Sequence, residues 1–254
     1  MKSPIKGNPL RNPAESLDEE IDVLVNEEAG TYIFIAAMTV LLTFLEWWRS
    51  YFEAPVSPIT YSVIASIVLP YCVFKVLQLK KKLKYLRQGR DGEKVVGQYL
   101  ELLRESGAKI FHDIPGDGFN LDHVVISNSG IYVIETKTYS KPENGSARMI
   151  FDGSSISFGG VMNNDKPIIQ VKAASHWLSE LLKNSTGSSH PIKPVVVFPG
   201  WFIEPTSEAR NSDVWVLNPK ALPTFISNSK EQMTHENIHM VAFHLSRYIR
   251  NYSR

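Results

Sequence analysis

GIYVIETK, residues 130–137, is a run of apolar, β-forming residues that ends in an acid and a base. Side chains alternate between the two faces of a strand with a period of two residues. Glu135 and Lys137 therefore project from the same face as the apolar Ile131 and Val133. A carboxylate and an ammonium group thus lie side by side at the end of a strand that is otherwise suited to burial.

The preceding run, FNLDHVVIS (residues 119–127), alternates in the same way and places Asp122 on the face of Ile126. The residues between the two runs, 127–130, read Ser-Asn-Ser-Gly, which is turn chemistry, so the strands are expected to form a hairpin. Pairing in that hairpin can bring Asp122 next to Glu135. Two acids and a lysine at one end of a sheet suit a hard divalent cation and a phosphate ester.

Length and composition indicate one medium-sized domain with a smaller element, and they limit the classes of site. Among the 254 residues there is a single cysteine, Cys72, which excludes an intramolecular disulfide and a cysteine-based zinc site. From Gly92 to the C-terminus, 16 basic residues balance 16 acidic ones. A neutral domain has no broad electrostatic attraction for nucleic acid, so any DNA binding must use a local patch.

The N-terminal third is expected to hold a membrane hairpin. Residues 1–28, with three prolines and an acidic run, are predicted to form a mobile arm that contains at most one short helix. Apolar stretches follow at about residues 31–48 and 59–79, and crossing a bilayer takes roughly 20 mostly apolar residues. We therefore expect two transmembrane helices with a basic flank over residues 29–86.

Charge near the second span predicts its orientation. Residues 75–90 contain seven basic residues and no acid. Such clusters stay on the cytoplasmic side, and two spans then place both the N-terminus and the C-terminal domain there. The sequence thus predicts a multi-pass protein of the cell (inner) membrane, with the lipid bilayer as one partner.

The alternative is a soluble helical hairpin packed against the domain, which the polar Thr60, Ser62 and Gln78 would permit. The stretch TYIFIAAMTVLLTFL (residues 31–45) is apolar on all sides, however, and leaves no face for solvent. The membrane hairpin is therefore the favoured interpretation.

After the basic segment, helices and strands are expected to alternate. Helices are predicted over about residues 91–106, 166–183, 219–227 and 236–248, and strands over about 108–114, 119–127, 130–137, 193–200 and 214–217, with short strands within 147–158. This alternation is typical of an α/β fold with a mixed sheet.

Four motifs occur in order: Gly89-x-x-Gly92-Glu93 at the start of a helix, LDHVVIS (121–127), GIYVIETKTY (130–139) and KPIIQ (166–170). At these residues the chain resembles the nuclease-related (NERD) domain, a branch of the PD-(D/E)XK nuclease superfamily. The resemblance covers roughly residues 88–200 of an expected domain spanning 88–254. It implies a restriction-endonuclease-like α/β fold, in which helices flank a mixed sheet.

Two residues depart from the pattern of that family. Leu121 stands where the superfamily name has proline, which is common in this branch. Thr138 stands where the branch often has asparagine. Neither departure touches an acid or the lysine.

The resemblance implies a catalytic site that uses Mg²⁺ or Mn²⁺. Asp122 and Glu135 would ligate the metal, helped by the backbone carbonyl of Thr136, and Lys137 would orient the attacking water and offset charge in the transition state. The residue types agree with this chemistry, because Mg²⁺ takes oxygen ligands and keeps several waters. A neighbouring carboxylate also holds a lysine in its charged form.

Two further residues enter through the resemblance. Glu93 matches a helix-borne acid that some members use for a second metal or a ligating water, and Gln170 matches a glutamine that supports the lysine or the phosphate. Each has a simpler interpretation: an acid favoured by the dipole at a helix start for Glu93, and a solvated helix residue for Gln170. Glu135 and Lys137 could likewise be a surface ion pair, worth under roughly 1 kcal/mol.

His235-Glu236-Asn237-Ile238-His239 fits the zinc-protease pattern H-E-x-x-H. That site needs a third ligand farther along the chain, and no Asp or Glu follows His239. We interpret the match as chance.

The sequence therefore predicts a membrane-anchored, divalent-metal-dependent nuclease that hydrolyses phosphodiester bonds in DNA, or in RNA, on the cytosolic side. The alternative is a catalytically inactive nuclease fold that is tethered to the membrane and binds nucleic acid or protein. The first is favoured because every acidic position and the lysine are filled, whereas a degenerate copy would be expected to lose one.

Overall fold

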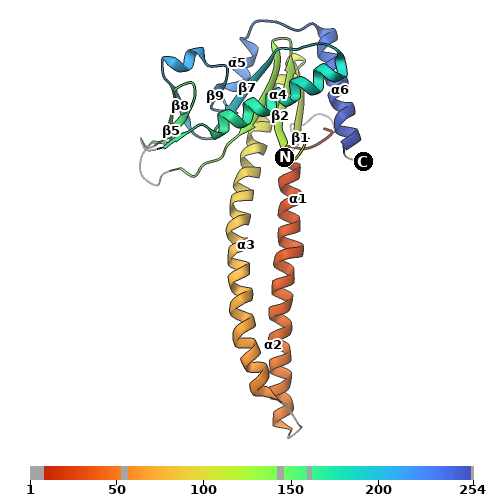
Figure 1. Cartoon of the computed structure of the whole chain (residues 1–254), viewed down its shortest axis with the longest axis vertical. Coiled ribbons are helices and arrows are strands. Elements are labelled where there is room, and N and C mark those ends of the chain that lie inside the picture. Colours follow the sequence, from red (N-terminus) through yellow and green to blue (C-terminus); the bar gives the residue numbers. More distant parts are fainter. Residues whose placement is uncertain (1–8, 53–56, 142–145, 159–161, 253–254) are drawn as a thin grey trace. The chain divides into compact units, whose positions relative to one another are not determined.

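The computed structural model describes residues 9–52, 57–141, 146–158 and 162–252. These residues divide into two compact units. One is a helical hairpin, residues 16–88, and the other is an α/β domain that joins the described residues up to Glu15 with those from Gly89 onward. Helix α3 (Pro58–Glu101) contributes to both units, and Figure 1 labels most of the elements.

Two antiparallel helical segments make up the hairpin (Figure 1). The first consists of α1, a π-helical turn and α2, with bounds Glu15–Val23, Leu24–Ala29 and Gly30–Tyr51, and the second is the N-terminal part of α3. Two side-chain contacts join the segments: Trp47 Nε1 donates to Ser62 Oγ at 3.0 Å, and Lys82 Nζ lies 2.8 Å from a carboxylate oxygen of Glu20. The first helix thus begins within the segment that the sequence assigned to an N-terminal arm.

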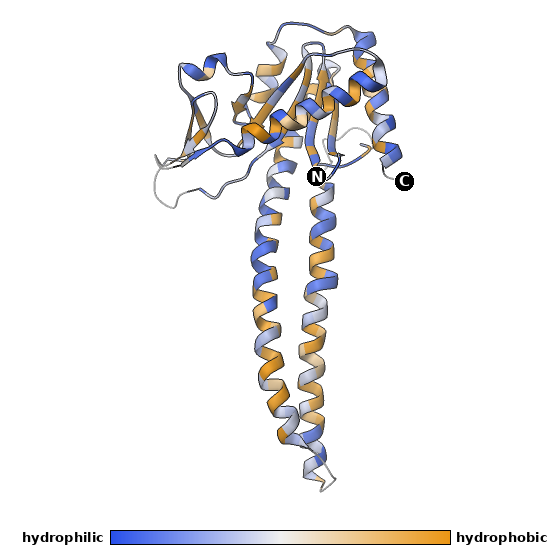
Figure 2. Cartoon of the chain, viewed as in Figure 1, coloured by the Kyte–Doolittle hydropathy of each residue, from blue (hydrophilic) through white to orange (hydrophobic). Residues whose placement is uncertain are grey.

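Apolar side chains of the hairpin are largely uncovered. Figure 2 shows hydrophobic residues concentrated in α2 and the first half of α3, and hydrophilic residues in the second half of α3. Phe34, Phe44, Ile59 and Ile67 each expose more than half of their surface. Within the described residues, both helical segments are long and apolar enough to cross a membrane. Because exposed apolar surface of this extent marks contact with an apolar partner, the two helices suggest association with a membrane.

A five-stranded mixed sheet forms the centre of the α/β domain (Figure 1). Its order is β1-β2-β3-β7-β9, in which β1 to β3 are antiparallel and β3, β7 and β9 are parallel. The bounds are Lys109–Pro115, Asn120–Ser127, Gly130–Thr136, Ile192–Val197 and Trp215–Leu217. The predicted hairpin is confirmed, with His123 opposite Ile134, and so is the mixed α/β fold.

Helices cover both faces of this sheet. They are α4 (Lys166–Thr186), α5 (Leu222–Ser227) and α6 (His235–Tyr252), with 3-10 segments at Leu102–Ser106 and Glu208–Asn211. Helices α4 and α6 pack on the face that carries Val124 and Val133. The C-terminal part of α3 and helix α5 pack on the other face, which carries Tyr132 and Ile134. The alternation read from the sequence therefore places Glu135 on the α4 face.

A second, four-stranded sheet has the order β6-β5-β4-β8. The bounds of its strands, in chain order, are Arg148–Phe151 (β4), Ile156–Phe158 (β5), Met162–Asn164 (β6) and Phe202–Pro205 (β8). Met149 and Ile156 extend the core on the α4 face. The sequence predicted short strands within 147–158 but neither β6 nor β8, because strands of three and four residues are too short to show an alternating pattern.

The residues just before α1 pack on the α/β domain. Arg11 Nη2 lies 2.8 Å from Asp113 Oδ2, and Asn120 Nδ2 donates to Asp113 Oδ1 at 3.0 Å. Asp113 has a φ of 47°, in the left-handed region that few non-glycine residues adopt, and these two contacts hold it there. Ala14 is fully buried. Residues 9–15 thus pack as part of the α/β domain.

Gly92 allows helix α3 to approach the end of β3 closely. A Cβ atom added at this position would meet the Cγ2 methyl of Thr138, two residues beyond the end of the strand. The next residue of the helix, Glu93, consequently lies close enough to Asp122 to act on it electrostatically. The glycine of the helix motif therefore helps bring an acid toward the strand end.

This contact predicts coupling between Gly92→Ala and Thr138→Ser. Serine lacks the methyl group that an alanine at 92 would meet, and overpacking typically costs 1–3 kcal/mol. We expect Gly92→Ala to be more favourable in the Thr138→Ser background by about 1 kcal/mol, measured by denaturant unfolding of all four proteins. The intrinsic helix preference of alanine is the same in both backgrounds and cancels. Additivity of the two changes within about 0.4 kcal/mol would contradict the packing described.

Candidate active site

Asp122 and Glu135 meet at the end of the β2–β3 hairpin. One position beyond the His123–Ile134 pair, the register sets Asp122 opposite Glu135. Asp122 Oδ2 accepts a hydrogen bond from the backbone N–H of Thr136 at 2.7 Å. A side-chain carboxylate thus satisfies a main-chain donor where the strand pairing stops.

Glu135, Lys137 and Gln170 form a closed ring of hydrogen bonds. Lys137 Nζ donates to Glu135 Oε1 at 2.7 Å and to Gln170 Oε1 at 2.8 Å. Gln170 Nε2 donates back to Glu135 Oε1 at 2.7 Å. Glu135 is only 4% exposed, whereas Gln170, near the start of α4, lies at the exposed rim. The ring therefore joins a buried strand end to the helix that covers it.

Burial and like charges make the acids of this site harder to ionise. The pKa of Asp122 is raised well above its usual value by burial, and next by the charges of Glu135 and Glu93. Burial likewise raises the pKa of Glu135, although Lys137 opposes the shift. Burial alone would lower the pKa of Lys137, but the charge and hydrogen bond of Glu135 outweigh it, so this pKa is raised. Lys137 is therefore positively charged at neutral pH.

The structure brings the residues singled out in the sequence into one place. Hydrogen bonds connect them in two groups, Asp122 with Thr136 and Glu135 with Lys137 and Gln170, while Glu93 acts on Asp122 through its charge. Their catalytic and metal-binding roles stay predictions.

Tyr139 belongs to the same surroundings and was not singled out. It contributes to the raised pKa of Lys137, and its phenol oxygen accepts a hydrogen bond from Asn164 Nδ2 at 3.0 Å. Its place two residues after Lys137 is the signal in the sequence that could have identified it, although the strand itself ends at Thr136.

His123 faces away from this site, because it follows Asp122 directly in the strand and successive side chains alternate between the two faces. Its ring is fully buried, and its Nδ1 lies 2.8 Å from Nδ1 of His112. Burial, and then the nearby His112, lower its pKa well below the usual range. This buried histidine pair lies on the other face, where it is a packing feature and supplies no ligand to the acids.

The donor set at the strand end fits a hard divalent cation. No group of three or more His, Cys, Asp or Glu side chains is arranged to hold a metal among the described residues. Two carboxylates and a backbone carbonyl are nevertheless enough for Mg²⁺, which keeps several of its waters. The repulsion that raises the pKa of Asp122 is also what a bound cation would relieve.

The electrostatics predict that Asp122→Asn stabilises the metal-free protein. The neutral amide removes the cost of a buried charge near two other acids and can still accept the N–H of Thr136. We expect the melting temperature in EDTA near neutral pH to rise by about 2 °C or more. Because the pKa of the folded state is the raised one, the gain should shrink as the pH falls and disappear below about 4, where the carboxyl becomes protonated in the unfolded state as well.

Asp213→Asn is the matched control, since that side chain is 88% exposed, and it should leave the melting temperature unchanged. A lower melting temperature for Asp122→Asn would show that the carboxylate is stabilised in place and would contradict the account of its charge.

Comparison with known proteins agrees with the motifs. Residues 88–199 match the family described as "Nuclease-related domain" (NERD). An uncharacterised protein of Bacillus anthracis is 35% identical to this chain over 57 residues. The matched segment is 20% of this chain and 27% of that protein, so the chain spans about a quarter of the length of this curated relative. The solved structure of Pyrococcus furiosus SfsA in complex with Ca²⁺ is 19% identical in sequence, and the match covers 51% of this chain and 54% of the SfsA chain. Its TM-score of 0.26 is too low to bear on the fold or the site. The resemblance drawn from the four motifs is thereby confirmed, because the matched residues contain all four.

Proposed function

We propose that this protein is a membrane-anchored nuclease whose α/β domain hydrolyses phosphodiester bonds of DNA, or of RNA, with a divalent metal ion. The observation that carries the proposal is the hydrogen-bonded ring of Glu135, Lys137 and Gln170 with Asp122 opposite. The match of residues 88–199 to a nuclease-related domain supports the same reaction class.

The acids of the site provide the place for the metal. Asp122 and Glu135, with the backbone carbonyl of Thr136, would hold a single Mg²⁺ or Mn²⁺, and Glu93 would hold a water of its coordination shell or a second ion. A bound ion of this kind lowers the pKa of a water and polarises a phosphate.

Lys137 is positioned to act on the phosphate itself. An ammonium group has three N–H donors, and Glu135 and Gln170 accept two of them. The remaining donor is available to a phosphate oxygen or to the attacking water, and the positive charge offsets charge that develops in the transition state. Gln170 is a positioning residue in this scheme, because it acts by fixing Lys137 and Glu135.

The hairpin supplies the anchor. Two apolar helices with exposed side chains support insertion in a bilayer, and the basic run at residues 75–90 supports a cytosolic position for the flank that follows them. Nucleic acid on the cytosolic side is then the substrate, and because the domain is neutral overall, binding relies on the site more than on a broad basic face.

The nuclease proposal predicts that Asp122→Asn and Lys137→Gln each lower cleavage by about 100-fold or more. The test uses the full chain in detergent, with plasmid, single-stranded DNA and RNA, in Mg²⁺, Mn²⁺ or EDTA. Asp213→Asn should cleave at the wild-type rate. Since Asp122→Asn is expected to be the more stable protein, its loss of activity cannot be attributed to unfolding.

Cleavage that persists in EDTA, or in both site variants, would contradict the proposal. A wild-type chain that binds these nucleic acids but cleaves none of them in any metal would instead support the inactive, tethered module.

The proposed anchor predicts that the protein stays in the membrane pellet after alkaline carbonate extraction, because high pH does not remove two apolar helices that are inserted in the bilayer. A soluble cytosolic protein in the same sample serves as the control and should be released. Release of this chain into the supernatant along with the control would contradict the two-span arrangement.

A further inference from the structure

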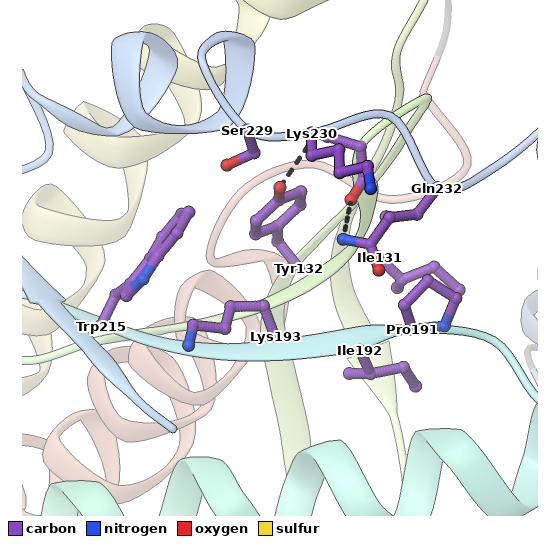
Figure 3. A pocket seen from close by; sticks show the side chains of 11 residues that line it. Ile131, Tyr132, Pro191, Ile192, Lys193, Trp215, Ser229, Lys230 and Gln232 are labelled. Carbon is purple, nitrogen blue, oxygen red and sulfur yellow. Dashed lines mark hydrogen bonds between the residues drawn. The ribbon is translucent and has the colours of Figure 1, made fainter. Parts of the chain in front are cut away.

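A cavity lies at the end of the central sheet opposite to the candidate active site. It has a volume of about 380 Å³, within the range of about 300–1,000 Å³ typical of small-molecule sites. Its walls come from the beginnings of β3, β7 and β9 and from residues 229–232 after α5 (Figure 3). Tyr132, in its wall, lies three residues before Glu135 and points to the opposite face, roughly 10 Å along the strand. The cavity is therefore separate from the candidate active site.

Aromatic rings form one wall of this cavity. Tyr132 and Trp215 lie with ring centroids 5.6 Å apart and planes tilted by 31°. Phe225 braces the indole from another side, edge-on at 5.5 Å. Trp215 is half-buried, so part of its ring lines the cavity, as Figure 3 shows. A braced, partly exposed indole is a stacking surface for a planar ring.

Two lysines line the same cavity, and no Asp or Glu is among its described lining residues. Lys193 is the cross-strand neighbour of Tyr132, and its Nζ lies 5.4 Å from the centroid of the Trp215 ring. Lys230 comes from the segment after α5. Burial lowers the pKa of Lys193, with the charge of Asp213 opposing the shift. An anion in the cavity would offset that cost of burying an ammonium group.

We propose that this cavity binds a nucleotide unit, with the base against Trp215 and the phosphate at Lys193 and Lys230. The combination decides the class of ligand: a phosphate by itself makes no use of the indole, and a neutral aromatic makes no use of two cations. The nucleotide can be a free mononucleotide or the phosphorylated end of a single strand, which present the same chemistry. The site uses none of the residues assigned to hydrolysis.

The test is isothermal titration of the full chain in detergent, with EDTA present so that no metal occupies the other site. The probes are AMP, adenosine, inorganic phosphate and a 5′-phosphorylated oligothymidylate of four residues. We expect AMP or the oligonucleotide to bind at least about tenfold more tightly than adenosine or phosphate, because charge-assisted and stacking contacts then add. Lys193→Gln and Lys230→Gln should each weaken that binding several-fold, and Trp215→Leu should abolish it.

Two controls keep the result interpretable. Lys183→Gln, on α4, should bind like the wild type, and Trp215→Phe, which keeps an aromatic ring, should retain part of the affinity if Trp215→Leu fails to fold. Tight binding of AMP assigns the site to free nucleotides, whereas binding of the oligonucleotide alone, lost in Lys193→Gln, assigns it to strand ends.

Equal affinity for AMP and adenosine, unchanged binding by Lys193→Gln, or no binding of any probe would overturn the proposal. The outcome is independent of the nuclease assay, since binding is measured in EDTA and is attributed to residues that take no part in hydrolysis.

Discussion

Glu135 is a carboxylate buried at the end of a central strand, and such a group is tolerated only when hydrogen bonds and an opposite charge replace its lost hydration. Lys137 and Gln170 provide both, and in doing so they tie β3 to α4. The position of the catalytic lysine in the proposed mechanism follows from this one requirement. Ionised Asp122 is less well stabilised: its carboxylate accepts a hydrogen bond from the main-chain N–H of Thr136, and the charges of Glu135 and Glu93 repel it. Local cost of this kind is typical of functional sites.

The part of this arrangement that the sequence predicted is the part set by local periodicity. The alternation in residues 130–137 and the turn chemistry at 127–130 were enough to predict the hairpin and the meeting of Asp122 with Glu135. The same rule accounts for the position of His123, which follows Asp122 and pairs with His112 on the other face. Gln170, by contrast, came from resemblance alone, because its contact with Glu135 spans 35 residues and no local pattern encodes it.

Other features depend on contacts that no window of sequence contains. The ion pair of Arg11 with Asp113 joins residues about a hundred positions apart, and Arg11 lies in the segment that the sequence predicted to be a mobile arm. Strands β6 and β8 are too short to show a period. The cavity opposite the candidate active site gathers Tyr132, Lys193 and Trp215 from three strands of the sheet. One sheet therefore presents charged groups at one end of β3 and a mixed aromatic and cationic cavity at the other.

The most direct test is to locate the metal. Crystals of the full chain grown with Mn²⁺, and measured for the anomalous scattering of that ion, should show a peak about 2.0–2.3 Å from carboxylate oxygens of both Asp122 and Glu135. Anomalous density elsewhere in the chain, with the two carboxylates unoccupied or turned away from each other, would contradict the account.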